Sequence, residues 1–90
     1  MPTIVWTNYL RYRANLRGFD LEKLERIIRQ SSERYSDTET GRRVVVGRHA
    51  EELVLIPYDE DEATITPVTV HAITRQQIRF RLATGRLRYE

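Results

Sequence analysis

The spacing of apolar residues changes near Tyr35, and this change constrains the fold of the chain more than any other feature. Before it, apolar residues recur at helical spacing, whereas runs of β-branched residues after it predict strands. The 90 residues leave room for one hydrophobic core, so we expect a single domain, residues 1–90. The predicted fold class is α+β: an N-terminal strand and helical hairpin, an antiparallel sheet of three to four strands and a C-terminal basic helix, with the helices on one face of the sheet.

The first residues predict a short strand followed by a helix. Pro2–Trp6 is rich in β-branched and aromatic residues, as strands are. Thr7 or Asn8 can cap the helix that follows, and Gly18 ends it. The residues of this helix that recur at helical spacing are Tyr9, Tyr12 and Leu16.

A second helix begins directly after this glycine. Asp20 is a good N-cap, and Phe19 before it can pack on Leu24 as a hydrophobic staple. The joint between the two helices is very short, so we expect them to form a helical hairpin. The apolar stripe of the second helix is Leu21, Leu24, Ile27 and Ile28.

Three strand-type runs follow, at residues 43–49, 53–58 and 64–73. The short connections between them favour antiparallel pairing. Pro67 interrupts the third run, and because proline has no N–H for the ladder it predicts an edge position or a bulge. Thr74 can cap a last helix that runs to Ala83, with Gly85 as its C-cap, and residues 87–89 are expected to form an extended tail.

Arginine dominates the charge of the chain. Of its 15 basic residues 14 are arginine, and the net charge is +2. Residues 51–62 carry six acidic side chains and no basic one, so the remaining chain is clearly basic. An arginine-rich coding bias is one explanation. The other is a basic surface for RNA, DNA or an acidic protein, because guanidinium groups match phosphate and carboxylate in geometry.

The chain contains no cysteine. This excludes disulfides, thiol nucleophiles and thiolate metal sites, and it is compatible with a reducing cytoplasm. The first residues lack the pattern of a signal peptide, and no apolar stretch approaches the length that spans a membrane. We therefore expect a cytoplasmic protein without a membrane partner.

Two histidines are the side chains expected to titrate near neutral pH, and both lie near the end of a predicted strand. Strand alternation places His71 on the same face as Thr69, away from the helix-packed core. Alternation leaves the face of His49 open, because His49 shares a side with both Val45 and Arg43. Each histidine is a candidate for proton transfer, and a structural role at the surface or in a hydrogen bond is the alternative for each.

Arginines in the last predicted helix are the second class of candidate. Arg75 and Arg79 are four residues apart, so they repel each other unless an anion lies between them. The alternative is a solvated helix face screened by the acidic turn at residues 59–62. Further arginines are candidates for RNA contacts: Arg13, Arg17, Arg43, Arg48, Arg81 and Arg86.

The motifs of nucleotide-dependent enzymes, serine hydrolases and zinc enzymes do not occur in the sequence. The acidic turn lacks the spacing of a calcium loop, so we predict no metal site and no cofactor. Cleavage of RNA needs neither, because the 2′-hydroxyl group is an internal nucleophile. A histidine can remove its proton, and arginine, which stays protonated, can stabilise the anionic phosphate.

Two segments of the chain resemble a known superfamily. The order of elements resembles the RelE/ParE superfamily of toxins, and "VHAITRQQIRFRLATGR" looks like the strand-to-helix segment of its BrnT-type branch, with Ala72–Arg75 at the junction. The segment "YLRYRANLRGFDLEKLERII" is similar to the opening helical hairpin of small bacterial domains of unknown function related to BrnT. In these domains the two helices are also joined by an arginine and a glycine followed by an aliphatic or aromatic residue, which is Arg17-Gly18-Phe19 in this chain.

This resemblance implies an mRNA endonuclease, dependent on the ribosome or independent of it, that an antitoxin protein holds inactive. Arg75 would then act at the strand–helix junction, with Arg79 close by. ParE-like members act on gyrase instead, so the fold alone does not assign the activity.

Three functions follow from these observations. The first is a toxin-like, metal-independent endoribonuclease in which Arg75, Arg79 and Arg43 stabilise phosphate and His71 or His49 moves the proton. The second is a non-catalytic interaction module that binds an acidic antitoxin or another protein target. The third is a nucleic-acid binder without chemistry, which we rank lower because no recognition helix stands out.

Overall fold

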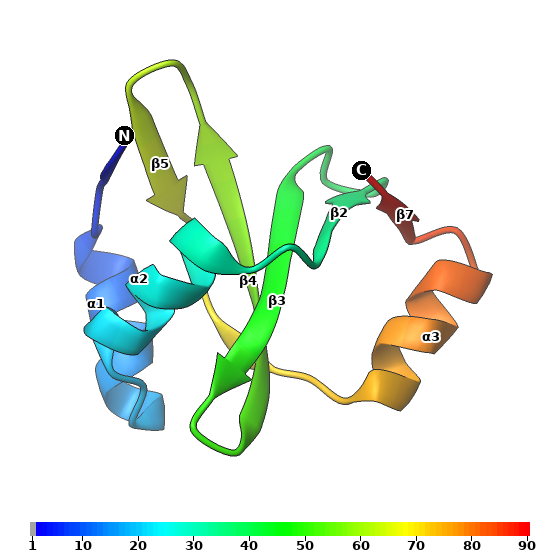
Figure 1. Cartoon of the computed structure of the whole chain (residues 1–90), viewed down its shortest axis with the longest axis horizontal. Coiled ribbons are helices and arrows are strands. Elements are labelled where there is room, and N and C mark those ends of the chain that lie inside the picture. The colour runs from blue at the N-terminus through cyan, green and yellow to red at the C-terminus, as the bar shows by residue number, and fades with distance from the viewer. Residues whose placement is uncertain (1) are drawn as a thin grey trace.

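A seven-stranded mixed sheet separates two hydrophobic cores in residues 2–90, the part of the chain that the computed structural model describes. The helices are α1 (Asn8–Arg17), α2 (Leu21–Gln30) and α3 (Arg75–Ala83). The strands are β1 (Thr3–Ile4), β2 (Arg34–Asp37), β3 (Arg43–His49), β4 (Glu52–Glu60), β5 (Thr64–Pro67), β6 (His71–Ala72) and β7 (Leu87–Tyr89). Along the sheet the strand order is β1-β5-β4-β3-β2-β7, and β6 pairs with β4 beyond the end of β5 (Figure 1).

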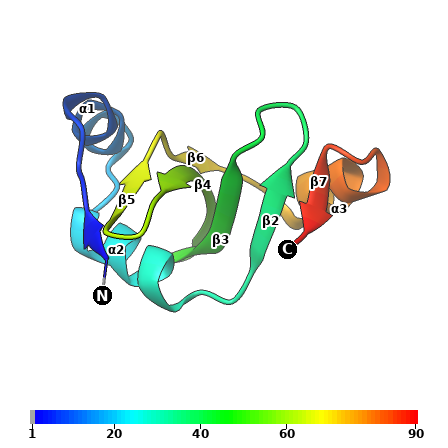
Figure 2. The ribbon, with the colours of Figure 1, turned by 90° about the horizontal axis from the view of Figure 1, so that it is seen from above.

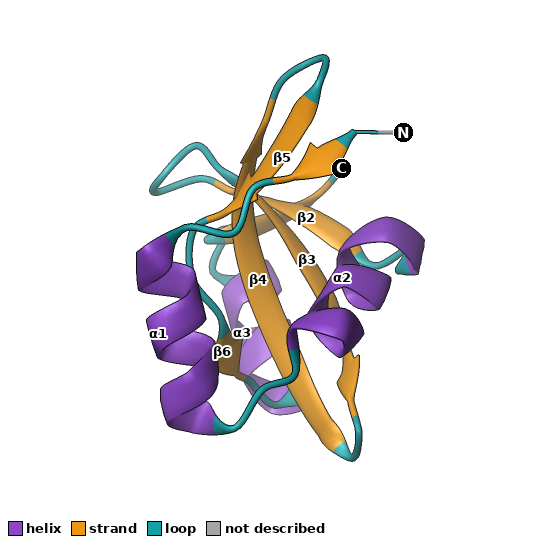
Figure 3. Cartoon of the chain, turned by 90° about the vertical axis from the view of Figure 1, so that its left-hand side faces the viewer, coloured by secondary structure: helices purple, strands orange, loops and turns teal. Residues whose placement is uncertain are grey.

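Helices cover both faces of this sheet. In β3, Val45 belongs to the core beneath α1 and α2, whereas Val44 and Val46 belong to the core beneath α3. The strands accordingly lie between the N-terminal hairpin and α3 in Figure 2, and Figure 3 shows α1 and α2 on the near side of the sheet. The predicted α+β class and order of elements are confirmed, but the expectation of one hydrophobic core and the prediction that all helices share one face are wrong. A strand buried on both faces is apolar at every position, as residues 44–46 and 53–56 are.

The sheet is larger than the three or four strands expected, because short strands extend it at both ends. β1 pairs in parallel with β5, and all other pairs are antiparallel. At the opposite end β2 pairs with β3 and β7. The sequence did not predict β2, because of its four residues only Tyr35 has a side chain typical of strands.

The buried face of α1 differs from the predicted one. Leu10 and Ala14, one turn apart, are the residues of α1 that the core buries. The exposed fractions of Tyr9, Tyr12 and Leu16 are 56%, 61% and 64%, so the three residues predicted to form the apolar face of α1 point outward. In α2, by contrast, the stripe of Leu24, Ile27 and Ile28 is buried as predicted, and Asp20 caps the helix.

A bulge separates β5 from β6. Tyr58 pairs with Pro67 but Leu55 pairs with His71, so the chain between the two pairs is one residue longer in this segment than in β4. Pro67 and Pro57 have no backbone N–H, so neither can donate a hydrogen bond to the ladder here. The carbonyl of Pro57 still accepts the Val68 N–H at 2.8 Å. The interruption predicted at Pro67 is therefore confirmed, and it opens the surface next to His71.

Gly47 allows β3 to approach α2 closely. A β-carbon at this position would lie 2.6 Å from Ile27 Cγ2 and 2.9 Å from Ile27 Cγ1. We expect Gly47→Ala to lower the free energy of unfolding by about 1–3 kcal/mol, measured by urea denaturation, because the buried isoleucine must shift. In the background of Ile27→Ala the same substitution should cost much less. Equal costs in the two backgrounds would contradict this packing.

Within residues 2–90, none of the helices combines the length and the apolar composition that a bilayer crossing requires.

Candidate functional site

A pocket of about 360 Å³ lies beside the bulge, on the side of the sheet that α3 covers, and His71 lines it. Leu55, Pro57 and Val68 supply its apolar wall. We call it the His71 pocket. The other polar residues that line it are Asp37, Thr40, Arg42, Thr69, Arg81 and Arg86. As predicted, Thr69 and His71 lie together on the side away from the core of α1 and α2.

Positive charges reach His71 from two helices. Burial, followed by the charges of Arg13, Arg81 and Arg17, lowers the pKa of His71 below its ordinary value of 6.5. Arg13 and Arg17 belong to α1, and Arg81 belongs to α3. The fold therefore brings together one predicted catalytic residue and three predicted RNA-binding residues, and it keeps the imidazole neutral at pH 7.

The three arginines around His71 have no acidic partner. Within residues 2–90, no carboxylate lies within 4 Å of the guanidinium groups of Arg13, Arg17 or Arg81. Two buried side-chain atoms in this part of the chain lack a hydrogen-bond partner, Arg13 Nε and Thr69 Oγ1. Both can donate a hydrogen bond to an anion, and an unpartnered buried polar atom costs free energy. Of these groups, the Thr69 hydroxyl and the Arg81 side chain belong to the lining of the His71 pocket, whereas Arg13 and Arg17 act on His71 through their charge from outside the lining.

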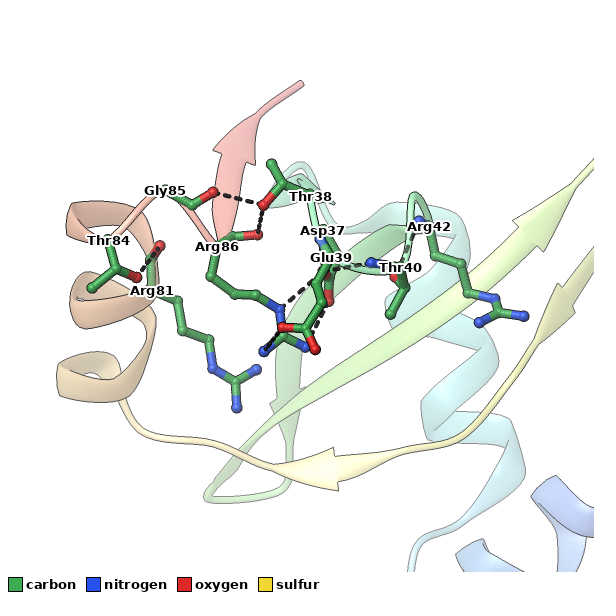
Figure 4. A network of polar contacts seen from close by, with 9 residues as sticks. All are labelled: Asp37, Thr38, Glu39, Thr40, Arg42, Arg81, Thr84, Gly85 and Arg86. Carbon is green, nitrogen blue, oxygen red and sulfur yellow. Dashed lines mark hydrogen bonds and ion pairs between the residues drawn. The ribbon is translucent and has the colours of Figure 1, made fainter.

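Arg86 differs from these three arginines, because carboxylates neutralise it. Its Nε and Nη2 donate to the two oxygens of Asp37 at 3.0 and 3.1 Å, and its Nη1 lies 3.1 Å from Glu39 (Figure 4). Burial acts to raise the pKa of Asp37, but hydrogen bonds from Arg86, Thr40 N–H and Glu39 N–H outweigh it and lower the pKa. Arg86 therefore joins the turn after β2 to the end of α3, and its predicted role in RNA binding is not supported by this balance of charge.

Arg42 is also balanced, because its Nε lies 3.1 Å from Asp59. The predicted RNA-binding residue Arg43 is placed outside the pocket, between Glu60 at 2.7 Å and Glu90 at 3.1 Å. Its charge is compensated by acidic residues that lie far from it in the sequence.

The strand–helix junction forms a separate hollow. Arg75 and Arg48 line it together with Glu51 and Glu52, and His71 does not. Arg75 Nη1 donates to Glu33 at 2.5 Å, so the predicted phosphate ligand already has a carboxylate partner. Arg79 lies on the exposed face of α3. The structure does not bring Arg75, Arg79 or Arg48 to His71, so the expected position of Arg75 and Arg79 beside this histidine is wrong, while the roles assigned to the three arginines stay predictions.

His49 has a structural role. It is buried, its Nε2 accepts the backbone N–H of Asp20 at 2.8 Å, and its ring packs edge-on against Phe19. It thereby fixes the N-terminus of α2 against β3. Because its Nε2 accepts this hydrogen bond and the residue does not line the His71 pocket, the structure supports a structural role for His49, and its predicted catalytic role stays a prediction without support.

Sequence reasoning did not assign four polar residues of the pocket to a site: Asp37, Thr40, Arg42 and Thr69. The sequence did hold a signal for Thr69, because it lies two residues after Pro67, where the strand is interrupted. Polar groups beside such an interruption can lack a hydrogen-bond partner, as Thr69 Oγ1 does. Asp37 had no signal, because β2 was not predicted and its partner Arg86 is 49 residues away.

The arrangement can bind an anion and accept a proton beside it. Within residues 2–90, no three side chains of the metal-binding types are grouped to hold a metal ion. A neutral imidazole next to three unpaired guanidinium groups matches a substrate that carries both a negative charge and an acidic proton.

Removing the Arg75 side chain tests the separation of the two sites. We expect Arg75→Ala to leave the binding of inorganic phosphate at the His71 pocket unchanged, measured by NMR titration. The free energy of unfolding should fall by no more than about 1 kcal/mol, because the Arg75 side chain of this ion pair is about half exposed and solvent screens its charge. A loss of phosphate binding would show that the junction belongs to the site.

Similarity to known proteins does not assign this chain to a family. The resemblance of its sequence to the RelE/ParE superfamily stays a prediction. No family model, no curated protein and no solved structure matches the chain.

Proposed function

We propose that the protein is a metal-independent endoribonuclease of the toxin type, acting on mRNA in the cytoplasm. The observation that supports this proposal is the position of His71 in a pocket, where the charges of three arginines without acidic partners act on it, Arg13, Arg17 and Arg81. An RNA phosphodiester supplies the negative charge that these arginines lack, and its neighbouring 2′-hydroxyl supplies the proton that a neutral imidazole can accept.

In this mechanism Arg81, which lines the pocket, holds the phosphate together with Arg13 and Arg17. His71 removes the proton of the 2′-hydroxyl, and the 2′-oxygen forms a bond to phosphorus. The bond from phosphorus to the 5′-oxygen breaks, and this oxygen takes a proton from solvent. The products are a 2′,3′-cyclic phosphate and a free 5′-hydroxyl end. The arginines stabilise the added negative charge of the crowded phosphate.

Cleavage of a labelled mRNA in the presence of EDTA tests the proposal. We expect cutting that leaves cyclic phosphate ends, with or without ribosomes. Arg81→Ala should slow it strongly and Arg79→Ala should not, because both residues lie on α3 and only Arg81 lines the pocket. A folded protein that cuts no RNA, alone or on ribosomes, would rule this function out.

The outer face of α1 favours a second function, a non-catalytic interaction module. Its exposed Tyr9, Tyr12 and Leu16 lie three and four residues apart along the helix, so they form one apolar stripe. The helix also carries three arginines and no acidic residue. Such a surface suits an acidic, amphipathic protein segment, and an antitoxin is the partner we propose for it.

Catalytic cleavage of RNA distinguishes the endoribonuclease from the interaction module. Tyr12→Ser combined with Leu16→Ser should abolish capture of an antitoxin encoded beside this protein, while RNA cleavage persists. If the wild-type protein binds such a partner and cuts no RNA, the interaction module is the better assignment.

A further inference from the structure

Phe80 exposes 68% of its surface although it lies in the middle of α3. The neighbouring Ile78 is 2% exposed and packs into the core beneath the helix, so Phe80 belongs to the opposite side. Residues three and four positions away share a helix face with it. Gln76, Gln77 and Thr84 therefore surround an aromatic ring that takes no part in the core.

These side chains line a second pocket, of about 660 Å³, which we call the Phe80 pocket. Arg81, Arg86 and Glu39 complete its lining. Arg81 and Arg86 also line the His71 pocket, so the two pockets adjoin across a pair of guanidinium groups. In Figure 4 both side chains extend from the end of α3 toward the turn that carries Glu39.

We propose that the Phe80 pocket binds a nucleobase of the RNA, next to the phosphate that Arg81 holds. This inference rests on the proposed function, because it assumes that the anion in the His71 pocket is a nucleotide phosphate. The base stacks on the face of Phe80, since every base presents a π-face to an aromatic side chain. Arg81 then contacts the phosphate on one side and borders the base on the other.

The carboxamide groups beside Phe80 can read the edge of this base. Gln77 Oε1 accepts the Thr74 N–H at 2.9 Å as part of the capping box, which leaves its NH₂ group to donate outward. Gln77 therefore favours a base edge that presents acceptors. The pocket is a specificity-determining site, separate from the residues that move the proton.

NMR titrations with the four nucleoside monophosphates and with ribose 5-phosphate, which has the phosphate and the sugar but no base, test this site. The wild-type protein should bind at least one nucleotide more tightly than ribose 5-phosphate. Phe80→Ala should reduce that advantage roughly tenfold, in line with the loss of one stacked base, and Phe80→Tyr should retain it. Since Phe80 is exposed, both variants are expected to fold, which thermal denaturation verifies.

Equal affinity for nucleotides and ribose 5-phosphate, or an unchanged advantage in Phe80→Ala, would overturn the base site, and so would the absence of any binding. A change of oligomeric state in Phe80→Ala without an effect on nucleotides would identify the ring as a contact between protein copies. Cleavage of RNA is a separate measurement. Should the protein cut no RNA while the base-dependent binding holds, the proposed catalysis fails and the nucleobase site stands.

Discussion

Replacing His71 with alanine is expected to slow RNA cleavage by about 100- to 10,000-fold, the range that removal of a positioned proton acceptor produces. His71 lines the pocket at the bulge, and burial and nearby arginines keep its imidazole neutral. Alanine removes the acceptor without removing the positive charges, so binding of RNA should change little. Single-turnover cleavage and RNA affinity, measured in parallel, distinguish a loss of chemistry from a loss of binding.

The lowered pKa of His71 also predicts how the cleavage rate and the free energy of unfolding change with pH. The base must be unprotonated, and its pKa lies below 6.5. Cleavage should therefore be flat from neutral pH upward and should fall about tenfold per pH unit once the pH drops below that pKa. Because the pKa is lower in the folded state than in the unfolded one, the unfolded chain binds more protons between the two values. The free energy of unfolding should consequently decrease as the pH falls through this window, and His71→Ala should lose that dependence.

His49 supplies the control for this experiment. Its Nε2 is engaged by the N–H of Asp20, so His49→Ala should lower stability by opening the cap of α2, and cleavage by the fraction that remains folded should be normal. Cleavage that survives in His71→Ala, or that declines as the pH rises from 6 to 8, would remove His71 from the role of base.

Local signals predicted most elements of this fold. Asp20 and Thr74 cap α2 and α3 as expected, and the run at residues 43–49 is β3. What local patterns did not resolve is which face of an element meets the sheet. In α1 the small Ala14 allows close packing, so the helix buries it with Leu10 and turns its bulkier residues outward. The apolar run of β4 is buried on both faces, so helices cover both sides, whereas the prediction from the sequence placed all helices on one face.

For the charged residues of the site, too, the local sequence does not show which side chains pair with each other. Arg75 and Arg81 look equivalent in the sequence, because both are basic residues of the last helix. They differ through a partner 42 residues away, since Glu33 pairs with Arg75 and no carboxylate among residues 2–90 pairs with Arg81. Likewise, alternation correctly placed His71 beside Thr69, whereas the burial of His49 depends on Asp20, 29 residues earlier. Long-range pairing therefore decides which of the many arginines remain available.

The availability of Arg13, Arg17 and Arg81 leads to the second large effect. A variant with all three replaced by alanine should bind single-stranded RNA about 100-fold more weakly at 0.1 M salt. The slope of log K against log salt concentration should become shallower by about 2, since each phosphate contact on a single strand contributes about 0.7 to it. Fluorescence anisotropy over a range of salt concentrations measures both quantities.

A matched triple variant separates this effect from the change in net charge. Arg26, Arg79 and Arg88 are exposed, and no carboxylate in residues 2–90 pairs with them. Replacing these three by alanine also removes three positive charges, but none of these charges acts on His71, whereas those of Arg13, Arg17 and Arg81 do. The salt slope of this variant should stay close to that of the wild type. If both triple variants lose affinity and slope equally, RNA is held by the overall charge of the protein, and the His71 pocket is not where its phosphate binds.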